Sequence, residues 1–332
     1  MISKQHIDEI LLAADLLSVM KDNGVAMNKS GSWLYMGNCP FHDEKSGSFF
    51  VNIKTQRYYC YGCSESGNAI SFLMKKKGVT FVEAVRELAK KCSIIIEEYT
   101  PSKEDEKKER FRTGMLEVYK AAASFFISQL EENPKALEYA RSRFKSETIE
   151  LFNIGYAPDD FNALYKHLRQ SGFGIDFLEK CDLFRPKKDG GLYDFFRNRL
   201  MFPILDITNH IIGFSGRDLG NDPKTPKYLN SSETPIYSKG KTLFALNFAF
   251  KEIRKSDCVV LVEGYADAIK LHELGVCNVI SSCGTALTDE QIGIIARFTK
   301  NFILLYDSDA AGQNAAEKTG KEYLQQGTMC MF

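Results

Sequence analysis

Two pairs of potential metal ligands lie near the beginning of the chain. Cys39 and His42 belong to the segment C-P-F-H, and Cys60 and Cys63 belong to C-Y-G-C. Two residues separate the members of each pair, which is the tight turn that a tetrahedral Zn²⁺ ion requires of its ligands. The seventeen residues between the pairs, 43–59, suffice for a β-hairpin that returns the chain to the metal. We therefore expect one structural zinc site, because four protein ligands leave no position for water.

Acidic residues follow two apolar, strand-like segments near the other end of the chain. Glu263 follows V-V-L-V, and Asp307 and Asp309 follow F-I-L-L-Y. Asp307 and Asp309 point the same way on an extended chain. Functional groups gather at the carboxyl ends of parallel strands, where converging carboxylates repel one another unless a divalent cation neutralises them. Oxygen ligands favour Mg²⁺ or Mn²⁺. Taken singly, each acid could instead cap a helix start.

The apolar patterning that must position these residues predicts an α+β chain with more than one domain. The elements expected in the first hundred residues are a helix over Ile7–Asp22, aromatic strands at 32–37, 48–53 and 56–61, and helices over Ala69–Lys77 and Phe81–Lys91. Thr80 and Glu83 have the spacing of a capping box. Residues 99–112 are charged and nearly free of aliphatic side chains, which predicts a linker or a solvated helix start.

Helical periodicity returns over Met115–Leu130 and Pro134–Ser142, and a mixture of short helices and strands follows up to residue 255. From residue 257 onward, strands alternate regularly with helices, a pattern that predicts βαβ units and a parallel sheet. The strands are expected at 259–264, 278–284 and 302–309, and T-M-C-M-F at the end of the sequence predicts the start of a fourth.

Charge is balanced over the whole chain but not along it. The 332 residues carry no net formal charge, yet residues 185–254 hold twelve Lys and Arg against seven acids, whereas residues 256–332 hold five against ten. A basic segment that leads into an acidic one suits a polyanion held beside a carboxylate–metal centre. On charge alone, two solvated faces of opposite sign explain the pattern equally well.

The composition is that of a globular protein, with 44% hydrophobic and 26% charged residues. No apolar run reaches the roughly 18 residues of a transmembrane helix. Acids within the apolar face of the N-terminal segment predict an amphipathic helix rather than a signal peptide. We therefore expect no membrane association, a cytoplasmic location and reduced thiols. The six cysteines outside the proposed zinc site are expected to be buried and inert.

Several segments resemble those of one family, the bacterial replicative DNA primases of the DnaG type. C-P-F-H-D-E-K-S-G-S-F, Y-Y-C-Y-G-C and G-N-A-I-S-F-L-M are similar to its CHC2-type zinc-binding domain. Y-D-F-F-R-N-R-L-M-F-P-I, I-I-G-F-S-G-R, the stretch 226–246, V-E-G-Y-A-D, C-G-T-A-L and Y-D-S-D-A-A-G are similar to its RNA polymerase domain. The resemblance runs from about residue 3 to the last residue. It implies a zinc-ribbon-type β-hairpin domain with helices, then a mixed α/β polymerase domain that ends in a partial Toprim sheet.

The resemblance also implies domain boundaries. They are a CHC2-type domain at 1–98, a charged linker at 99–114, a basic N-terminal polymerase subdomain at 115–255 and an incomplete Toprim subdomain at 256–332. The implied activity is that of a primosome nucleotidyltransferase, which synthesises short RNA primers from nucleoside triphosphates on single-stranded DNA. The implied partners are the template, the nucleotides and a replicative helicase, and we expect the chain to be a monomer.

Residue roles are carried over by motif match. Glu263, Asp307 and Asp309 would be catalytic, and with Asp267 they would hold Mg²⁺ or Mn²⁺. The positions that match basic loops facing template and nucleotide phosphates are Arg199, Arg217, Lys227, Lys239 and Lys241.

The chain departs from the family pattern at a few places. Gly47 stands where the family usually has proline, and Ser64 stands where it usually has glycine. Family members continue into a D-G-x-D-P-D segment with further metal-binding acids, and then into a helicase-interacting domain. We therefore expect a C-terminally truncated primase with a weakened catalytic metal site.

Two other functions remain open at this point. The chain could be a weakly active or inactive fragment that serves only as a zinc-dependent module for single-stranded DNA. Either as a primase or as such a module, the chain could contact DNA through aromatic residues and one arginine of the zinc domain, namely Phe49, Phe50, Tyr58, Tyr59 and Arg57. Alternation along a strand exposes only about half of these side chains. A Toprim nuclease or topoisomerase is the third possibility, but no context for a tyrosine nucleophile is visible.

Overall fold

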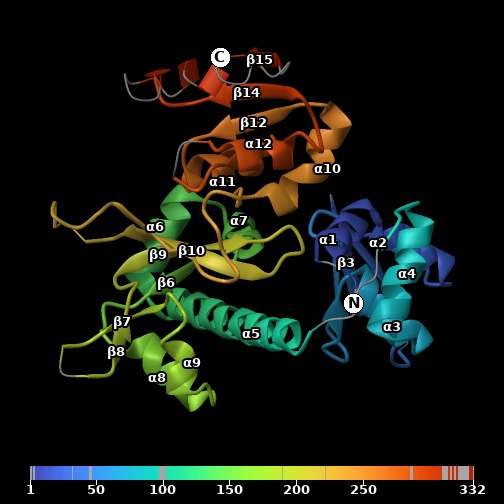
Figure 1. Ribbon diagram of the computed structural model, residues 1–332, viewed down its shortest axis with the longest axis horizontal. Coiled ribbons are helices and arrows are strands. Elements are labelled where there is room, and N and C mark those ends of the chain that lie inside the picture. The colour runs from blue at the N-terminus through green and yellow to red at the C-terminus, as the bar shows by residue number, and fades with distance from the viewer. Residues whose placement is uncertain are drawn as a thin grey trace. The chain divides into compact units, whose positions relative to one another are not determined.

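The computed structural model describes residues 2, 4–31, 33–44, 47–96, 102–188, 190–220, 222–284, 287–308, 313, 314, 316, 317, 319, 320 and 329–331. The chain forms two compact units, Met1–Glu106 and Lys107–Phe332 (Figure 1). Each unit has its own core of buried apolar side chains. Among the described helices, none combines the length and the apolar character of a membrane span.

The first unit is an antiparallel sheet with helices. The sheet has the order β1-β2-β3-β4-β5, which is also the order of the strands along the chain. The strands are β1 (Asn28–Lys29), β2 (Leu34–Gly37), β3 (Phe49–Asn52), β4 (Arg57–Cys60) and β5 (Ser66–Gly67). The helices are α1 (Lys4–Ala13), α2 (Leu16–Asp22), α3 (Ala69–Lys77) and α4 (Phe81–Lys91). The expected strands and the β3–β4 hairpin are confirmed.

The expectation of one helix over Ile7–Asp22 is wrong, because the chain breaks between α1 and α2. Asp15 has an extended backbone, and its side chain accepts a hydrogen bond from the Ser18 amide as the N-cap of α2. A short polar side chain that bonds to the backbone competes with helix continuation. The capping box of α4 is confirmed, since Thr80 and Glu83 each bond to the other's backbone amide.

The second unit contains one long helix followed by short elements. Helix α5 (Lys103–Glu132) starts in the charged segment and crosses the boundary between the units without a break. The sequence left two possibilities for residues 99–112, a linker or the start of a helix, and the structure has a helix over residues 103–112. The other helices with described bounds are α6 (Pro134–Arg143), α7 (Ser146–Leu151), α8 (Ala163–Gln170), α9 (Ile175–Leu178), α10 (Leu246–Ser256), α11 (Tyr265–Glu273) and α12 (Asp289–Ile295).

The strands of the second unit form three sheets. An antiparallel sheet of order β11-β10-β9-β6 consists of β6 (Gly155–Ala157), β9 (Arg199–Leu205), β10 (Ile211–Asp218) and β11 (Tyr228–Asn230). Helix α5 packs against it, with Tyr119 stacked on Phe214 and Phe126 edge-on to the same ring. Strands β7 (Phe184–Pro186) and β8 (Leu192–Asp194) form a two-stranded sheet.

The third sheet is parallel throughout and has the order β13-β12-β14-β15. Its strands are β12 (Val259–Val262), β13 (Val279–Ser281), β14 (Asn301–Leu305) and β15 (Met329–Met331). Helices α10 and α11 contact β13. This sheet confirms the expected βαβ alternation, and β15 confirms the fourth strand expected at T-M-C-M-F.

Candidate functional sites

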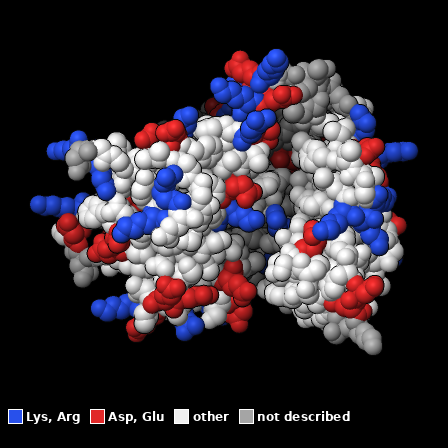
Figure 2. All heavy atoms as spheres, turned by 90° about the horizontal axis from the view of Figure 1, so that it is seen from below, with Lys and Arg blue, Asp and Glu red and all other residues white. Residues whose placement is uncertain are grey.

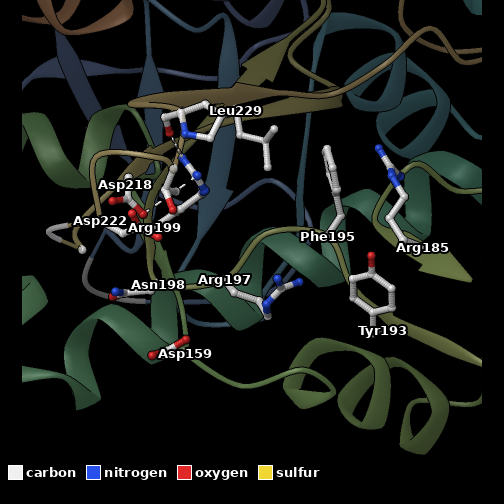
Figure 3. A pocket seen from close by; sticks show the side chains of 13 residues that line it. Asp159, Arg185, Tyr193, Phe195, Arg197, Asn198, Arg199, Asp218, Asp222 and Leu229 are labelled. Atoms are coloured by element: carbon white, nitrogen blue, oxygen red, sulfur yellow. Dashed lines mark hydrogen bonds and ion pairs between the residues drawn. The ribbon is translucent and has the colours of Figure 1, made fainter. Parts of the chain in front are cut away.

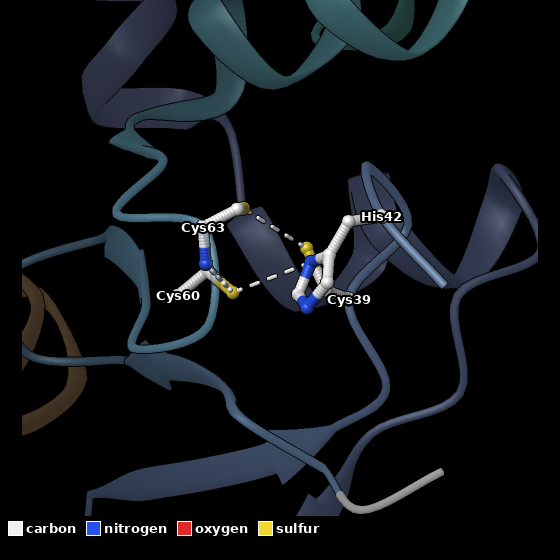
Figure 4. Close-up of side chains that lie close together, drawn as sticks. All are labelled: Cys39, His42, Cys60 and Cys63. Carbon is white, nitrogen blue, oxygen red and sulfur yellow. Dashed lines mark hydrogen bonds between the residues drawn. The ribbon is translucent and has the colours of Figure 1, made fainter. Parts of the chain in front are cut away.

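The sulfur and imidazole groups of the first unit converge as their spacing predicts. One donor atom from each of Cys39, His42, Cys60 and Cys63 lies within 4.8 Å of the other three (Figure 4). The Sγ atoms of Cys39 and Cys63 are 3.8 Å apart, and Cys60 Sγ is 3.8 Å from His42 Nδ1. Two thiolates bound tetrahedrally to one Zn²⁺ ion through bonds of about 2.3 Å lie ~3.8 Å apart. The donor set therefore fits a metal ion in both chemistry and size.

Two tight backbone turns bring the ligand atoms close together. Cys60 ends strand β4, and the Cys63 amide donates to Cys60 Sγ at 3.4 Å. In the other turn the Phe41 amide donates to Cys39 Sγ at the same distance. Burial opposes ionisation of Cys60, but hydrogen bonds from Ser48 and the backbone outweigh it and lower the thiol pKa to about 7. Burial raises the pKa of Cys39, so a bound cation is needed to hold both sulfurs as thiolates.

The hairpin that carries Cys60 also presents aromatic rings. Phe49 and Tyr58 are buried in the core of the first unit, whereas Tyr59 is 41% exposed. Tyr61, which is 71% exposed, contacts both Phe50 and Tyr59 edge-on. The alternation expected along these strands is confirmed, and the outward group is Phe50, Tyr59 and Tyr61.

The parallel sheet of the second unit brings two of the predicted acids together. Glu263 directly follows β12, and Asp307 lies two residues beyond β14. The Asp307 amide donates to Glu263 Oε1 at 2.9 Å, and the Ser281 hydroxyl donates to the Glu263 carbonyl at 3.0 Å. Glu263 is half-buried and Asp307 is exposed. Asp309 lies outside the described residues.

Asp267 lies close to the same strand end, in the first turn of α11. A Cβ atom at Gly264 would be 2.5 Å from Asp267 Oδ2, so the carboxylate packs against the Gly264 backbone and a larger residue there would displace it. Across the described residues, the Cys and His cluster is the only set of three or more such donors within ligand reach of one another. The carboxylates at the sheet edge therefore lie farther apart than the ligand atoms of the Cys and His cluster.

The predicted basic residues lie in different surroundings. Arg199 is buried, with its guanidinium 3.0 Å from the carbonyls of both Gly216 and Pro226 and 3.9 Å from Asp218 Oδ1. It holds the segment between β10 and β11. Burial lowers its pKa, an effect that Asp218 opposes.

The other four predicted basic residues are more accessible. Arg217 lies over the ring of Tyr139 at 5.3 Å, and Lys241 pairs with Glu290 at 3.1 Å. Lys227 is exposed, and its side chain makes no hydrogen bond or ion pair within the described part of the chain. The Lys239 side chain is half-buried, while its backbone bonds to neighbouring side chains.

A cleft of about 560 Å³ opens beside the antiparallel sheet (Figure 3). Its lining combines arginines, aromatic rings and acids, namely Asp159, Arg185, Tyr193, Phe195, Arg197, Asn198, Arg199, Asp218, Gly220, Asp222, Thr225, Pro226 and Leu229. The Arg185 guanidinium stacks on Phe195 at 3.5 Å. Arg197 lies over Phe161 at 4.3 Å and over Tyr193 at 5.3 Å. Flat cationic and aromatic groups of this kind suit a single-stranded nucleic acid.

Sequence reasoning missed Phe161, Arg185, Tyr193, Phe195 and Arg197 as site residues. The signal was the alternation of aromatic rings and arginines in Y-D-F-F-R-N-R. Phe161 and Arg185 lie outside that segment and had no such signal, because they reach the aromatic and arginine groups only through the fold. Figure 2 shows Lys and Arg interspersed with Asp and Glu over the visible face.

Hydrogen bonds of the buried residue Asp194 connect several segments beside the cleft. Its carboxylate accepts the amides of Leu164 and Tyr165 at 2.8 and 3.0 Å, at the start of α8. Its own amide donates to the Phe161 carbonyl, and its carbonyl accepts from Arg197. Burial raises the pKa of Asp194 to about 6, against the two backbone hydrogen bonds.

Comparison with known families matches three successive parts of the chain. Residues 2–104 match the CHC2 zinc finger of DnaG, residues 125–250 match the N-terminal domain of the DNA primase catalytic core, and residues 257–332 match a Toprim domain. A crystal structure of the Aquifex aeolicus primase, with its zinc-binding and RNA polymerase domains, is 32% identical. It covers 96% of this chain, this chain covers 76% of it, and the TM-score is 0.65. The chain belongs to the DnaG family of DNA primases.

Other DnaG primases agree with this assignment. The DNA primase of Clostridium acetobutylicum is 39% identical over 316 residues, which are 92% of this chain and 52% of that protein. The chain thus spans about half the length of the curated relatives that it matches. A solved DnaG catalytic domain bound to single-stranded DNA is 35% identical, with a TM-score of 0.57, and covers 64% of this chain, which covers 68% of it. The matched parts are thus a zinc-finger domain and a Toprim domain, and the chain carries a Cys₃His group in the first.

Proposed function

We propose that the chain catalyses DNA-templated synthesis of short RNA primers from nucleoside triphosphates. The observation that carries the proposal is the pairing of Asp307 with Glu263 at the sheet edge, in the same folded unit as the arginine- and aromatic-lined cleft. Membership of the DnaG family supports it. The domains proposed for this activity remain those of residues 1–98, 115–255 and 256–332, with the charged segment between the first two.

In this proposal each metal has its own ligands. Zn²⁺ is held by Cys39, His42, Cys60 and Cys63, and its role is structural because the four protein ligands complete a tetrahedron. Mg²⁺ or Mn²⁺ is held by the acids at the edge of the parallel sheet, namely Glu263, Asp267, Asp307 and Asp309. A cation bound there neutralises the carboxylates and polarises the transferring phosphoryl group.

The proposed reaction joins two nucleotides. The 3′-hydroxyl oxygen of one attacks the α-phosphorus of the next, the bond to pyrophosphate breaks, and the hydroxyl proton leaves. We propose that the Glu263 carboxylate acts at this step, either by accepting the hydroxyl proton or by binding the metal ion. Its carboxylate is half-buried and receives the Asp307 amide, so its orientation is set before substrate arrives.

The template is proposed to lie in the cleft of the second unit. Bases would stack on Phe161, Tyr193 and Phe195, while Arg197 and Arg185 would contact phosphates. The exposed Lys227, with Arg217, Lys239 and Lys241, is proposed to contact template or nucleotide phosphates. The Arg199 guanidinium already donates to backbone carbonyls. Arg199 would therefore contribute indirectly, by fixing the position of the segment between β10 and β11.

A primer-synthesis assay on single-stranded DNA with labelled nucleotides tests the proposal. We expect RNA products that require a divalent cation, and Glu263→Gln should reduce their rate about 10²-fold or more. Glu252→Gln is the matched control, because Glu252 lies on α10 of the same unit and pairs only with Lys255 among the described residues. DNA binding without product would favour the binding-module alternative, and template cleavage would favour a nuclease. Full activity of Glu263→Gln would remove Glu263 from its proposed role.

A further inference from the structure

One acidic side chain of the first unit makes all its polar contacts around the Cys and His cluster. Glu44 Oε1 accepts the Cys39 amide at 2.6 Å and the Ser48 amide at 3.0 Å. Glu44 Oε2 accepts the Ser48 hydroxyl and lies 3.4 Å from His42 Nε2. Both carboxylate oxygens are therefore used, and the side chain is only 10% exposed.

The contact with His42 sets which ring nitrogen is free to bind a metal. His42 Nδ1 faces the cluster, 3.8 Å from Cys60 Sγ, and Nε2 on the opposite edge of the ring faces Glu44. A carboxylate at Nε2 keeps the proton there and leaves the Nδ1 lone pair for the ion. Gly62 allows this orientation, because a Cβ at that position would lie 2.6 Å from Nε2.

The remaining contacts reach two further ligands. The Cys39 amide that Glu44 accepts belongs to a ligand residue, so the carboxylate holds the start of the C-P-F-H turn. Ser48 Oγ lies 3.3 Å from Cys60 Sγ, so the hydroxyl that bonds to Glu44 also adjoins the hairpin thiolate. Glu44 is thus connected to Cys39, His42 and Cys60, and these come from both turns of the site.

We propose that Glu44 is the positioning residue of this metal centre. Its carboxylate fixes the orientation and tautomer of His42 and ties the two ligand-bearing turns to each other through Ser48. The proposal rests on the zinc site put forward above. Carboxylates that orient a ligand histidine typically account for roughly 10- to 100-fold in metal affinity, and we assign a contribution of that size to Glu44.

The test measures Zn²⁺ affinity of the whole chain by competition with a chromogenic chelator. Glu44→Gln keeps the size of the side chain but removes the charge and replaces one of the two acceptor oxygens with a donor, so it can no longer accept from the Cys39 and Ser48 amides and face His42 with an oxygen at the same time. It should weaken Zn²⁺ binding about 10-fold or more. Asp43→Asn is the matched control, because Asp43 is the exposed neighbouring acid of the same loop, and it should bind Zn²⁺ within about twofold of the parent chain. Glu44→Gln with the affinity of Asp43→Asn would overturn the proposal.

A second measurement separates orientation of His42 from general destabilisation. In the Co²⁺-substituted chain, the ligand-field bands should shift in Glu44→Gln, because the imidazole is no longer held, and should not shift in Asp43→Asn. Unchanged bands in Glu44→Gln would count against orientation even where affinity falls. A parent chain that retains no Zn²⁺ would instead refute the zinc site itself, an outcome that the competition assay detects before any variant is made.

Discussion

The Cys₃His cluster of the first unit and the acidic edge of the second hold their ligand atoms in different ways. The cluster gathers four donors within 4.8 Å, and two of its cysteines are buried. At the acidic edge, Glu263 meets the backbone of Asp307 rather than its carboxylate, and both Asp267 and Asp307 are exposed. The first arrangement brings all its donor atoms to one point, whereas the second leaves its carboxylates apart and open to solvent.

This difference follows from the chemistry of the two groups. Cysteine thiols are neutral or only partly ionised at neutral pH, so they can pack together in a small core at lower electrostatic cost than carboxylates. Carboxylates are charged at neutral pH and repel one another, so an edge exposed to water keeps them apart until a cation and phosphates are present. The closed site suits a structural ion, and the open one suits a substrate that enters and leaves.

The largest effect is expected from removing one ligand of the Cys₃His cluster. Cys60→Ala removes a ligand at the end of β4, and we expect loss of Zn²⁺ and unfolding of the first unit, while the second unit stays folded. Structural Zn²⁺ contributes about 10–16 kcal/mol in zinc-finger peptides, which is as large as the net stability of a typical protein, about 5–15 kcal/mol. Metal analysis and hydrogen exchange over 34–67 check this. Cys92→Ala is the control, because Cys92 lies outside the cluster, and this variant should keep its Zn²⁺. If Cys60→Ala keeps its Zn²⁺ as well, Cys60 is not a ligand of a structural zinc site.

The next prediction sharpens the role of the cleft in the second unit. Arg197→Ala removes a guanidinium that lies over two rings, and we expect single-stranded DNA affinity to fall about 10-fold, with a salt slope reduced by roughly 0.7. Binding titrations over a range of salt concentrations measure both quantities. Arg254→Ala is the control, because Arg254 lies over Phe298 in a similar pair outside the cleft lining. Equal affinity of the two variants would place the template elsewhere.

A smaller effect concerns the pH dependence of the second unit. Burial raises the pKa of Asp194 from 3.8 to about 6, so the native state binds a proton that the unfolded chain has already lost. The contribution of Asp194 to stability is therefore full below about pH 3.8 and is lost as pH rises through 6. Between pH 5 and pH 7.5, the parent chain should lose on the order of 1 kcal/mol relative to Asp194→Asn. Urea unfolding of the second unit at both pH values checks this, and parallel curves would argue against the raised pKa.

The smallest effect concerns a helix that the metal does not touch. Thr80→Ala removes the hydroxyl that caps α4, and we expect a loss of about 1 kcal/mol in the first unit without a change in Zn²⁺ content. Thr80→Ser keeps the hydroxyl and should restore most of that stability. Thermal unfolding of the Zn²⁺-loaded chain measures the difference, and a Zn²⁺ loss in Thr80→Ala would show that cap and metal centre are not independent.

Sequence alone was sufficient where the determining contacts are local. The two ligand pairs, the hairpin between them and the capping box of Thr80 all depend on residues a few positions apart, whose spacing the backbone converts directly into geometry. The βαβ alternation was equally readable, because its apolar periodicity does not depend on what the strands pack against. The break at Asp15 was missed, because the apolar period continues across it while a side-chain cap competes with the helix.

Tertiary structure decided what depends on distant residues. The sequence predicted Glu263 and Asp307 at one sheet edge, but their direct contact across 44 positions depends on β12 and β14 being neighbours in the sheet. Arg199 looked like an exposed phosphate contact, but the sheet buries it against carbonyls from two other segments. Phe161 lies against Arg197, which lines the cleft, only because Asp194 joins the start of α8 to the end of β8. Spacing along the chain carries no information about such contacts, since packing of the whole unit, not local backbone geometry, sets their distances.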